Sequence, residues 1–307
     1  MIEVFVDGAS GTTGLEIVER LGKHPDFTPV VLGEAHRKDR EARREALNDS
    51  DYAVLCLPDV AARDAIELVE AGSKVRIVDA SSAHRTASGW TYGFPELGFR
   101  TAIAESARVS NPGCYPTGFL AGIAPLVAAG HLPADWPYGV HAVSGYSGGG
   151  KALIERIGKE PGLAWRGYAL SLEHKHLAEM QTHGGLAHAP IFSPAVAPAF
   201  RGMVVEVPLP LGAIEGAASP AAMREHLAET YDGSRIVRFL DNLPEELVLD
   251  RDAAAWDGMV LRLLVSEDGS RAKLVATLDN LGKGASGAAL QNLNLMAGLP
   301  ETRGLAL

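Results

Sequence analysis

The stretch IEVFVDGASGTTGLEIVERL at residues 2–21 is the strongest indication of the fold of this chain. It opens with a β-rich run at residues 2–6, passes through a turn of glycine, serine and threonine, and ends in a helical pattern. Its glycines Gly8, Gly11 and Gly14 follow the spacing G-x-x-G-x-x-G rather than the common dinucleotide-binding spacing G-x-G-x-x-G. A strand, a glycine turn and a helix in this order are the context that a phosphate-binding loop requires.

Each residue type in this turn has a physical reason to be there. The first glycine permits a tight turn, the second lets a pyrophosphate approach the backbone, and the third lets helix and strand lie close together. Hydroxyl side chains near the positive end of the helix can donate to phosphate. The predicted dinucleotide-binding residues of the loop are Gly8, Ser10, Gly11, Thr12, Thr13 and Gly14. A plain turn is the alternative, and the strand in front of it favours the nucleotide site.

The segment after the second apolar run indicates which dinucleotide is bound. The run at residues 28–32 is the next predicted strand, and a site for NADH would then offer Asp or Glu to the ribose hydroxyls. The sequence Ala35-His36-Arg37-Lys38 follows instead, and Arg37 and Lys38 suit a ribose 2′-phosphate. We therefore predict NADPH/NADP+ as the cofactor. The alternative is a solvated basic start to the next helix.

Strands and helices alternate through the first third of the chain. Apolar runs at residues 52–57 and 75–79 continue the pattern, which predicts a parallel sheet with helices on both faces. The fold class is thus α/β, with a Rossmann-type doubly wound domain at residues 1–113. Residues 114–283 show mixed features that predict an α+β catalytic, substrate and oligomerisation domain, and the helix in 284–307 is expected to return to the first domain.

Composition excludes several classes of protein. A length of 307 residues exceeds the usual size of one domain. The formal net charge of −10 leaves no basic surplus to neutralise phosphates, so nucleic acid is not an expected partner. The chain has no apolar stretch of membrane-spanning length and no basic secretory leader, so neither a membrane nor export is expected. Only Cys56 and Cys114 are present, which favours a reducing cytoplasm over a disulfide framework.

The sequence NPGCYPTG around Cys114 raises the question of whether this thiol reacts. Pro112-Gly113 forms a turn, and Pro116 suits the first turn of a helix. At a helix N-terminus, free N–H groups and the macrodipole favour the thiolate over the thiol. A cysteine that merely packs at a helix start is the other possibility. Cys56, inside an apolar run, is most simply a small buried residue.

Two further motifs lie downstream of Cys114. Glu173-His174-Lys175-His176, with Glu179 three residues on, supplies candidates for proton transfer to a cysteine nucleophile. The two histidines lie two residues apart, which does not stack them on one helical face, so no metal site is expected.

The other motif is the glycine-rich stretch Gly145-Tyr-Ser-Gly-Gly-Gly150-Lys151, which fits most of the P-loop pattern. Ala152 follows the lysine in place of the Ser or Thr that would bind magnesium, which disfavours an ATPase. We expect a glycine-rich loop beside substrate or nicotinamide instead. Ser144 and Gly145 are the predicted cofactor contacts, and Ser147 and Gly148 are the predicted substrate contacts.

Five motifs together make the chain resemble one family, N-acetyl-γ-glutamyl-phosphate reductase, in its compact branch. They are NPGCYPTG at Cys114, SGYSGGGK at 144–151, EHKH at 173–176, FRGM at 200–203 and DNLGKGASGAALQNLNLM at 279–296. The loop GASGTTG fits as well, so the resemblance spans nearly the whole chain. Aspartate-semialdehyde dehydrogenase shares the expected fold, but its reactive cysteine generally stands in G-N-C-T.

The resemblance implies an activity and a role for each matching residue. The substrate would be an acyl phosphate of arginine biosynthesis, reduced through a thioester on Cys114, with His176, or else His174, as acid and base. Longer relatives would read H-R-H-x-P-E here, which leaves the choice of histidine open. Further implied contacts are Arg85, Arg201 and Glu179 for substrate and Asn280 and Gly284 for cofactor. The alternative for each arginine is that it is a surface residue that does not contact substrate.

The resemblance also implies a homodimer or homotetramer. Three competing interpretations stay open at this point. An aspartate-semialdehyde-type or aminoadipyl-phosphate reductase would use the same chemistry on another acyl group. A non-catalytic dinucleotide-binding redox sensor would explain the nucleotide loop but would leave the cysteine and histidine motifs without a role.

Overall fold

The computed structural model describes all of residues 1–307. The chain divides into two compact units. The first unit comprises Met1–Gly113 and Ala285–Ala306, and the second comprises Cys114–Gly284 together with Leu307.

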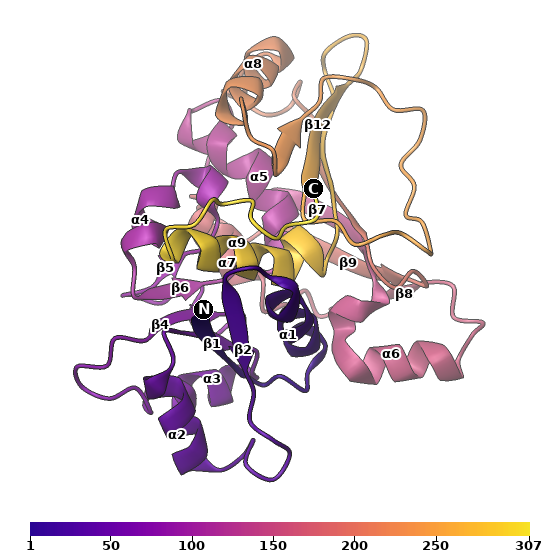
Figure 1. Cartoon of the computed structure of the whole chain (residues 1–307). Helices are drawn as coiled ribbons and strands as arrows, with labels where there is room; N and C mark the ends of the chain where they lie inside the picture. The colour runs from indigo at the N-terminus through magenta and orange to yellow at the C-terminus, as the bar shows by residue number, and fades with distance from the viewer. The chain divides into compact units, whose positions relative to one another are not determined.

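A six-stranded parallel sheet forms the centre of the first unit (Figure 1). Its strands lie in the order β2-β1-β3-β4-β6-β5. Their bounds are β1 Ile2–Asp7, β2 Phe27–Val30, β3 Tyr52–Leu55, β4 Arg76–Asp79, β5 Thr91–Tyr92 and β6 Arg108–Ser110. The helices of this unit are α1 Thr12–Lys23, α2 Arg40–Asp49, α3 Asp59–Ile66, α4 Arg100–Glu105 and α9 Gly287–Met296. The predicted doubly wound parallel sheet is confirmed.

Alternation along the strands creates a core on each face of this sheet. Val4 and Val6 point to one face, where they pack with residues of α1, α4 and α9. Phe5, between them, points to the other face and packs with residues of α2 and α3. Successive strand residues point to opposite faces, so a run that is apolar throughout is buried on both sides. The C-terminal helix α9, yellow in Figure 1, thus completes the core of the N-terminal sheet.

The second unit contains a seven-stranded mixed sheet in the order β11-β12-β13-β10-β7-β9-β8. The bounds are β7 Gly139–Gly145, β8 Arg166–Gly167, β9 Ile191–Ala197, β10 Met203–Leu209, β11 Val237–Phe239, β12 Met259–Val265 and β13 Ala272–Leu278. The helices are α5 Cys114–Ala128, α6 Gly150–Lys159, α7 Leu177–His183 and α8 Pro220–Thr230. The α+β character expected for this part of the chain is confirmed.

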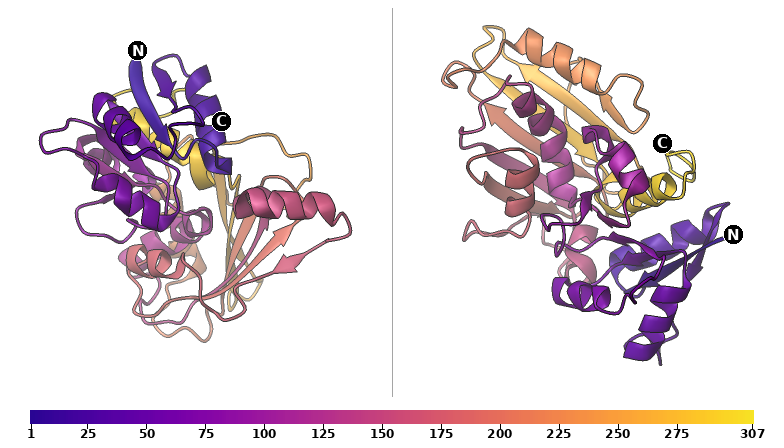
Figure 2. Two further views of the ribbon diagram at one scale, coloured as in Figure 1. Left: turned by 90° about the horizontal axis from the view of Figure 1, so that it is seen from below. Right: turned by 90° about the vertical axis from the view of Figure 1, so that its left-hand side faces the viewer.

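Helix α5 lies against this sheet and carries Cys114 at its start. Two of its glycines allow the close approach: a Cβ on Gly118 would lie 2.7 Å from Val205 Cγ2, and one on Gly122 would lie 2.9 Å from Leu274 Cδ1. Helix α8 packs beside α5, and Figure 2 shows it in orange along the strands of this unit. The position of Cys114 is therefore set by a buried helix, not by a mobile loop.

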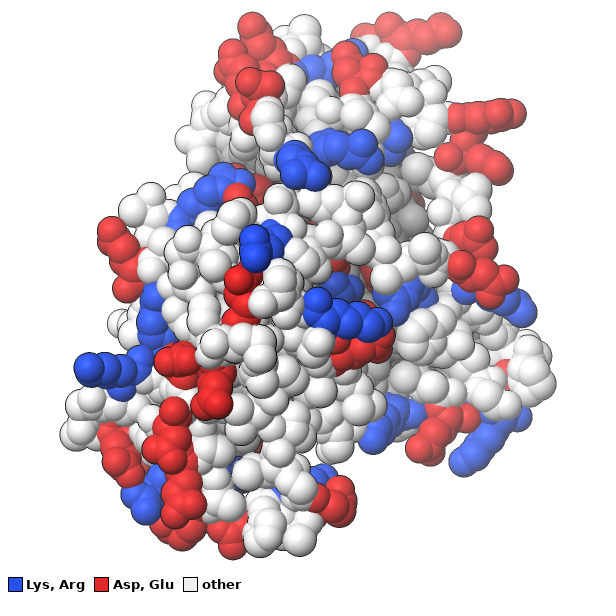
Figure 3. All heavy atoms as spheres, viewed as in Figure 1, with Lys and Arg blue, Asp and Glu red and all other residues white.

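Charged side chains of both signs are interspersed over the face of the molecule in Figure 3. No helix combines the length and the apolar character that would be needed to span a membrane.

Candidate functional site

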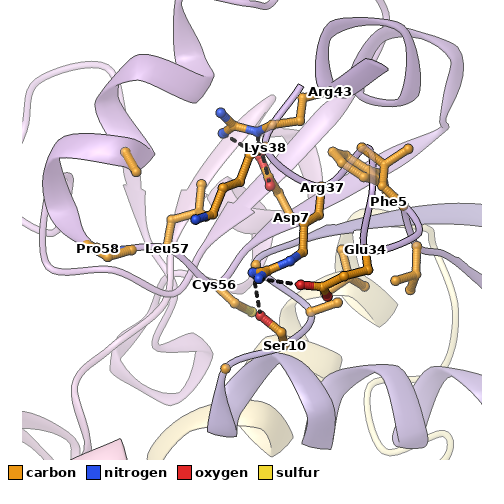
Figure 4. A pocket seen from close by; sticks show the side chains of 17 residues that line it. Phe5, Asp7, Ser10, Glu34, Arg37, Lys38, Arg43, Cys56, Leu57 and Pro58 are labelled. Carbon is orange, nitrogen blue, oxygen red and sulfur yellow. Dashed lines mark hydrogen bonds and ion pairs between the residues drawn. The ribbon is translucent and has the colours of Figure 1, made fainter. Parts of the chain in front are cut away.

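The glycine turn opens onto a pocket of about 650 Å³ in the first unit (Figure 4). The pocket lies at the carboxyl ends of β1 and β3, where the open edge of a doubly wound sheet binds ligands. Its lining includes Gly8, Ser10 and Gly11 from the turn and Arg37 and Lys38 from the segment after β2.

The turn has the geometry of a phosphate cradle. Gly8 has φ +84°, and a Cβ there would lie 2.3 Å from the carbonyl oxygen of Cys56. A Cβ on Gly14 would lie 2.3 Å from the Gly8 carbonyl oxygen, so α1 can begin only if this residue is glycine. Bare backbone therefore faces the pocket beside the N-terminus of α1, which suits the pyrophosphate of a dinucleotide.

Three cationic side chains line the same pocket, and two of them are held by acids. Arg43 on α2 makes a bidentate ion pair with Asp7, with Nη2 2.7 Å and Nε 3.1 Å from Oδ2. Arg37 pairs with Glu34 at 2.6 Å and donates to Ser10 Oγ at 3.4 Å. Lys38 is the third. The residues present thus fit the adenosine and phosphate groups of a nicotinamide dinucleotide.

The other predicted cofactor residues lie elsewhere. Thr12, Thr13 and Gly14 form the first turn of α1 and do not line the pocket. Ser144, Gly145, Asn280 and Gly284 belong to the second unit.

Cys56, expected to be a small buried residue of the core, is only partly covered. Its side chain packs against one core of the first sheet, but the residue is half-buried and lines the pocket. Cys56 follows directly after β3 and lies next to Gly8, at the carboxyl end of the strands. Burial, with smaller effects of the carboxylates Asp79 and Asp7, raises the pKa of its thiol well above the ordinary value. Cys56 is therefore an unreactive thiol at neutral pH.

Cys114 occupies the first position of α5, as the Pro-Gly turn in front of it predicts. The N–H groups and dipole of a helix of 15 residues face this end. Gly284 packs directly on it, because a Cβ at Gly284 would lie 2.8 Å from Cys114 Cβ and 3.3 Å from Cys114 Cα. Gly284 sits in a π-helical turn at Gly282–Ser286 that leads into α9. The structure therefore brings together two residues that lie 170 positions apart in the sequence.

A cluster of Tyr115, Tyr168, His174 and His176, here called the histidine–tyrosine cluster, adjoins Cys114. The two histidine rings lie 4.7 Å apart, and the His176 ring lies 5.9 Å from that of Tyr115. Tyr168 donates a hydrogen bond of 3.1 Å to the Tyr115 hydroxyl. The backbone N–H of His176 donates to His174 Nδ1 at 3.1 Å, which fixes that nitrogen as an acceptor.

Burial sets the protonation states of this cluster. It lowers the pKa of His174 to about 4, with the charge of Lys175 as a smaller cause, so that His174 is neutral at pH 7. It also raises the pKa of Tyr168 to about 12, with the charge of Cys114 among the smaller contributions. Burial likewise raises the pKa of Tyr115 far above its ordinary value. Tyr115, Tyr168 and His174 are thus neutral donors and acceptors next to the thiol.

The glycine-rich loop forms a second group of residues within the same unit. Asn280 donates to Ser147 Oγ at 2.9 Å, and a Cβ on Gly148 would lie 3.4 Å from both Asn280 Nδ2 and Ser144 Oγ. Gly145 packs on the backbone of Arg201, where its Cβ would lie 2.8 Å from Arg201 Cα. Motifs that are separate in the sequence therefore converge here.

Of the remaining predicted substrate residues, Arg85 and Glu179 are buried and Arg201 is half-buried. Arg201 Nη1 pairs with Asp279 at 2.9 Å, beside Asn280. Glu179 is the third residue of α7, the helix that follows His176. Arg85 lies in the first unit and donates to the carbonyl oxygens of Asn111 at 2.9 Å and Ala80 at 3.1 Å. These hydrogen bonds anchor the segment that leads to Cys114, and a substrate contact by Arg85 stays a prediction.

Sequence reasoning missed four residues of these sites. Glu34, Asp7 and Arg43 line the nucleotide pocket, and Tyr168 belongs to the histidine–tyrosine cluster. Glu34 could have been found, because it follows the second strand where an acid was sought. Tyr168 is hydrogen-bonded to Tyr115, which lies 53 residues earlier, so no local sequence pattern predicts this contact. The structure contains no group of three His, Cys, Asp or Glu side chains that could hold a metal ion.

Comparison with known proteins agrees with this geometry. Residues 3–106 match the family model described as semialdehyde dehydrogenase, NAD binding domain, and residues 114–280 match semialdehyde dehydrogenase, dimerisation domain. Aspartate semialdehyde dehydrogenase from Francisella tularensis has the same fold, with a TM-score of 0.71 at 14% identity over 97% of this chain and 100% of that one. The probable aspartate-semialdehyde dehydrogenase from Pseudomonas aeruginosa gives 0.70 at 17% over 96% and 98%.

Proteins similar in sequence identify the family within this fold. The N-acetyl-gamma-glutamyl-phosphate reductase of Trichormus variabilis is 47% identical over 99% of both chains. The protein of the same name from Brucella ovis is 47% identical over 96% of this chain and 99% of its own. Identity of this level over nearly the full length shows the family. The chain therefore belongs to the N-acetyl-gamma-glutamyl-phosphate reductase family and has the semialdehyde dehydrogenase fold.

Proposed function

We propose that this chain reduces N-acetyl-γ-glutamyl phosphate to N-acetyl-glutamate 5-semialdehyde and phosphate with NADPH, in arginine biosynthesis. It is an oxidoreductase that uses a nicotinamide cofactor, as its two matched domains and its relatives indicate. The observation that carries the proposal is the position of Cys114 at the start of the buried helix α5, beside the histidine–tyrosine cluster.

In the first step, the Cys114 thiolate attacks the acyl carbon of the substrate. The bond from carbon to the phosphate oxygen breaks, phosphate leaves, and a thioester remains on Cys114. The helix N-terminus favours the thiolate that this attack requires. Main-chain and side-chain donors of the glycine-rich loop, Ser147 and Gly148 among them, are suited to hold the substrate, and Arg201 and Glu179 border that loop and the cluster.

The second step reduces the thioester. A nicotinamide cofactor held at the glycine turn of Gly8 and Gly11 would supply the hydride that this reduction requires at the carbonyl carbon. One histidine of the cluster donates a proton to the carbonyl oxygen, which gives the thiohemiacetal. The same histidine takes the hydroxyl proton back as the carbon–sulfur bond breaks, which releases the aldehyde and returns the thiolate. We assign the proton transfer to His176. His174, neutral and fixed as an acceptor by the His176 backbone N–H, orders the pair.

The cofactor is assigned as NADPH on the charge of its pocket. Arg37 and Lys38 line the pocket after β2, and Arg37 donates to Ser10 of the glycine turn. A ribose 2′-phosphate carries the charge and the acceptor oxygens that these cations need. We place Ser144, Gly145, Asn280 and Gly284 around the nicotinamide. The match of the second unit to a dimerisation domain supports a homo-oligomer, which we propose is a homodimer or homotetramer in the cytoplasm.

The reverse reaction gives a simple test of this function. Purified protein is mixed with phosphate, NADP+ and one of three aldehydes: N-acetyl-glutamate, aspartate or N-acetyl-aminoadipate semialdehyde. We expect absorbance at the NADPH band to rise with the first aldehyde and to depend on phosphate. Stronger activity with either other aldehyde would replace the substrate assignment. Turnover with none of them would instead favour a nucleotide-binding sensor.

The lowered pKa of His174 predicts a specific dependence of stability on pH. In the unfolded chain its pKa returns to 6.5, so the unfolded state binds more protons than the folded state between pH 6.5 and about 4. The contribution of His174 is therefore present above pH 6.5 and is lost as the pH falls toward 4. Denaturant unfolding at several pH values should show a steeper loss in the wild type than in His174→Gln. Parallel curves for the two proteins would contradict the neutral, buried His174.

A further inference from the structure

The nucleotide pocket contains two ion pairs that differ in how far they are exposed to solvent. Asp7 is buried and Arg43 is mostly covered, with 5% and 16% of their side chains exposed. Glu34 and Arg37 are much more exposed, at 80% and 38%. An exposed ion pair contributes little to stability and separates easily, whereas a buried bidentate pair resists separation because it would leave a desolvated charge.

Arg37 is therefore the arginine that an incoming anion can recruit. Figure 4 shows its guanidinium between Glu34 and Ser10, with the pair of Asp7 and Arg43 further along the same pocket. A phosphate group that binds Arg37 must displace the Glu34 carboxylate or lie against it, and both are anions. A ribose that carries a 2′-hydroxyl meets no such conflict, because it can donate a hydrogen bond to the carboxylate while the ion pair stays intact.

We propose that Glu34 sets the preference between the two nicotinamide cofactors by competing with the 2′-phosphate for Arg37. This inference rests on the proposed function, since it concerns the same cofactor site. Glu34 lowers affinity for the phosphorylated ribose and supports binding of the ribose with a free 2′-hydroxyl. Arg37 and Lys38 favour the phosphate against this opposition. Glu34 therefore lowers the ratio of the affinity for NADPH to the affinity for NADH below the ratio that Arg37 and Lys38 alone would produce.

Two cofactor fragments test the proposal without any catalytic step. Adenosine 2′,5′-bisphosphate carries the 2′-phosphate, and adenosine 5′-monophosphate carries the 2′-hydroxyl. Dissociation constants of both are measured by isothermal titration calorimetry for the wild type and for Glu34→Gln. We expect the variant to bind the bisphosphate about three- to fivefold more tightly, because an exposed charge pair is worth that much, and to bind the monophosphate no better.

Glu41→Gln provides a matched control. Glu41 also pairs with an arginine three residues on, Arg44, and their exposures of 66% and 40% resemble those of the first pair. It does not line the pocket. For Glu41→Gln, we expect the dissociation constants of the bisphosphate and the monophosphate to keep the ratio that they have in the wild type. A change as large as that of Glu34→Gln would mean that loss of any nearby negative charge suffices, and would overturn the proposal.

Arg37→Gln identifies the group for which Glu34 competes. This variant should bind the bisphosphate at least about tenfold more weakly, and Glu34→Gln should confer no gain in the Arg37→Gln background. A full gain in that background, or an unchanged ratio in Glu34→Gln alone, would contradict the proposal and leave the enzyme assignment intact. If the wild type bound neither fragment, the cofactor assignment itself would fall, and this inference with it.

Discussion

Replacing Cys114 by serine should lower the rate of phosphate-dependent NADP+ reduction by at least about a thousandfold. A serine hydroxyl at this position stays protonated, because a helix N-terminus lowers the pKa of a thiol into the working range but not that of an alcohol. The adenosine 2′,5′-bisphosphate affinity of the first unit should stay within about twofold of the wild type, since Cys114 does not line that pocket. The measurement is an initial-rate assay together with a calorimetric titration.

Alkylation separates the two cysteines in the same experiment. Iodoacetamide should label Cys114 rapidly and Cys56 slowly, because burial, with smaller effects of two neighbouring carboxylates, raises the pKa of the Cys56 thiol, whereas Cys114 lies at a helix N-terminus. Peptide mapping identifies the labelled residue. Preferential labelling of Cys56, or turnover of Cys114→Ser near the wild-type rate, would refute the assignment of the nucleophile.

Gly8→Ala should weaken binding of the cofactor and destabilise the protein. The added Cβ would lie 2.3 Å from the Cys56 carbonyl oxygen on a backbone with φ +84°, so the turn has to move. We expect a loss of about 1–3 kcal/mol in the free energy of unfolding and at least about a tenfold weaker affinity for adenosine 2′,5′-bisphosphate. Denaturant titration and calorimetry measure the two effects.

Gly33→Ala is the appropriate control, because a Cβ there meets nothing within 4 Å. It should change stability by less than about 0.5 kcal/mol. Equal effects of the two substitutions would show that the close packing of the Gly8 turn does not matter for the site.

Local patterns predict the parts of this molecule that local physics determines. The strand at Ile2–Asp7, the turn at Gly8 and the helix that follows depend on neighbouring residues, and each forms where the sequence indicates. The same holds for Cys114 at the start of α5, which the Pro-Gly turn positions. Arg37 and Lys38 also line the pocket that their place after β2 suggests.

Residues brought together by tertiary structure could not be predicted in the same way. In the sequence, Arg43 is one of several charged residues on a predicted helix surface. Only the packing of α2 against the sheet places it beside Asp7. Cys56 reads as a core residue because its run is apolar, yet the end of the strand exposes it to the pocket. The contact between Gly284 and Cys114 depends on a π-helical turn that has no simple sequence signature.

Intact-protein mass spectrometry tests directly whether a thioester forms on Cys114. The protein is incubated with N-acetyl-glutamate 5-semialdehyde and NADP+ in the absence of phosphate, and phosphate is then added. We predict one N-acetyl-glutamyl adduct per chain, located on Cys114 by peptide mapping and released by phosphate. Formation of NADPH with no adduct on Cys114, or an adduct that also forms in Cys114→Ser, would contradict the account.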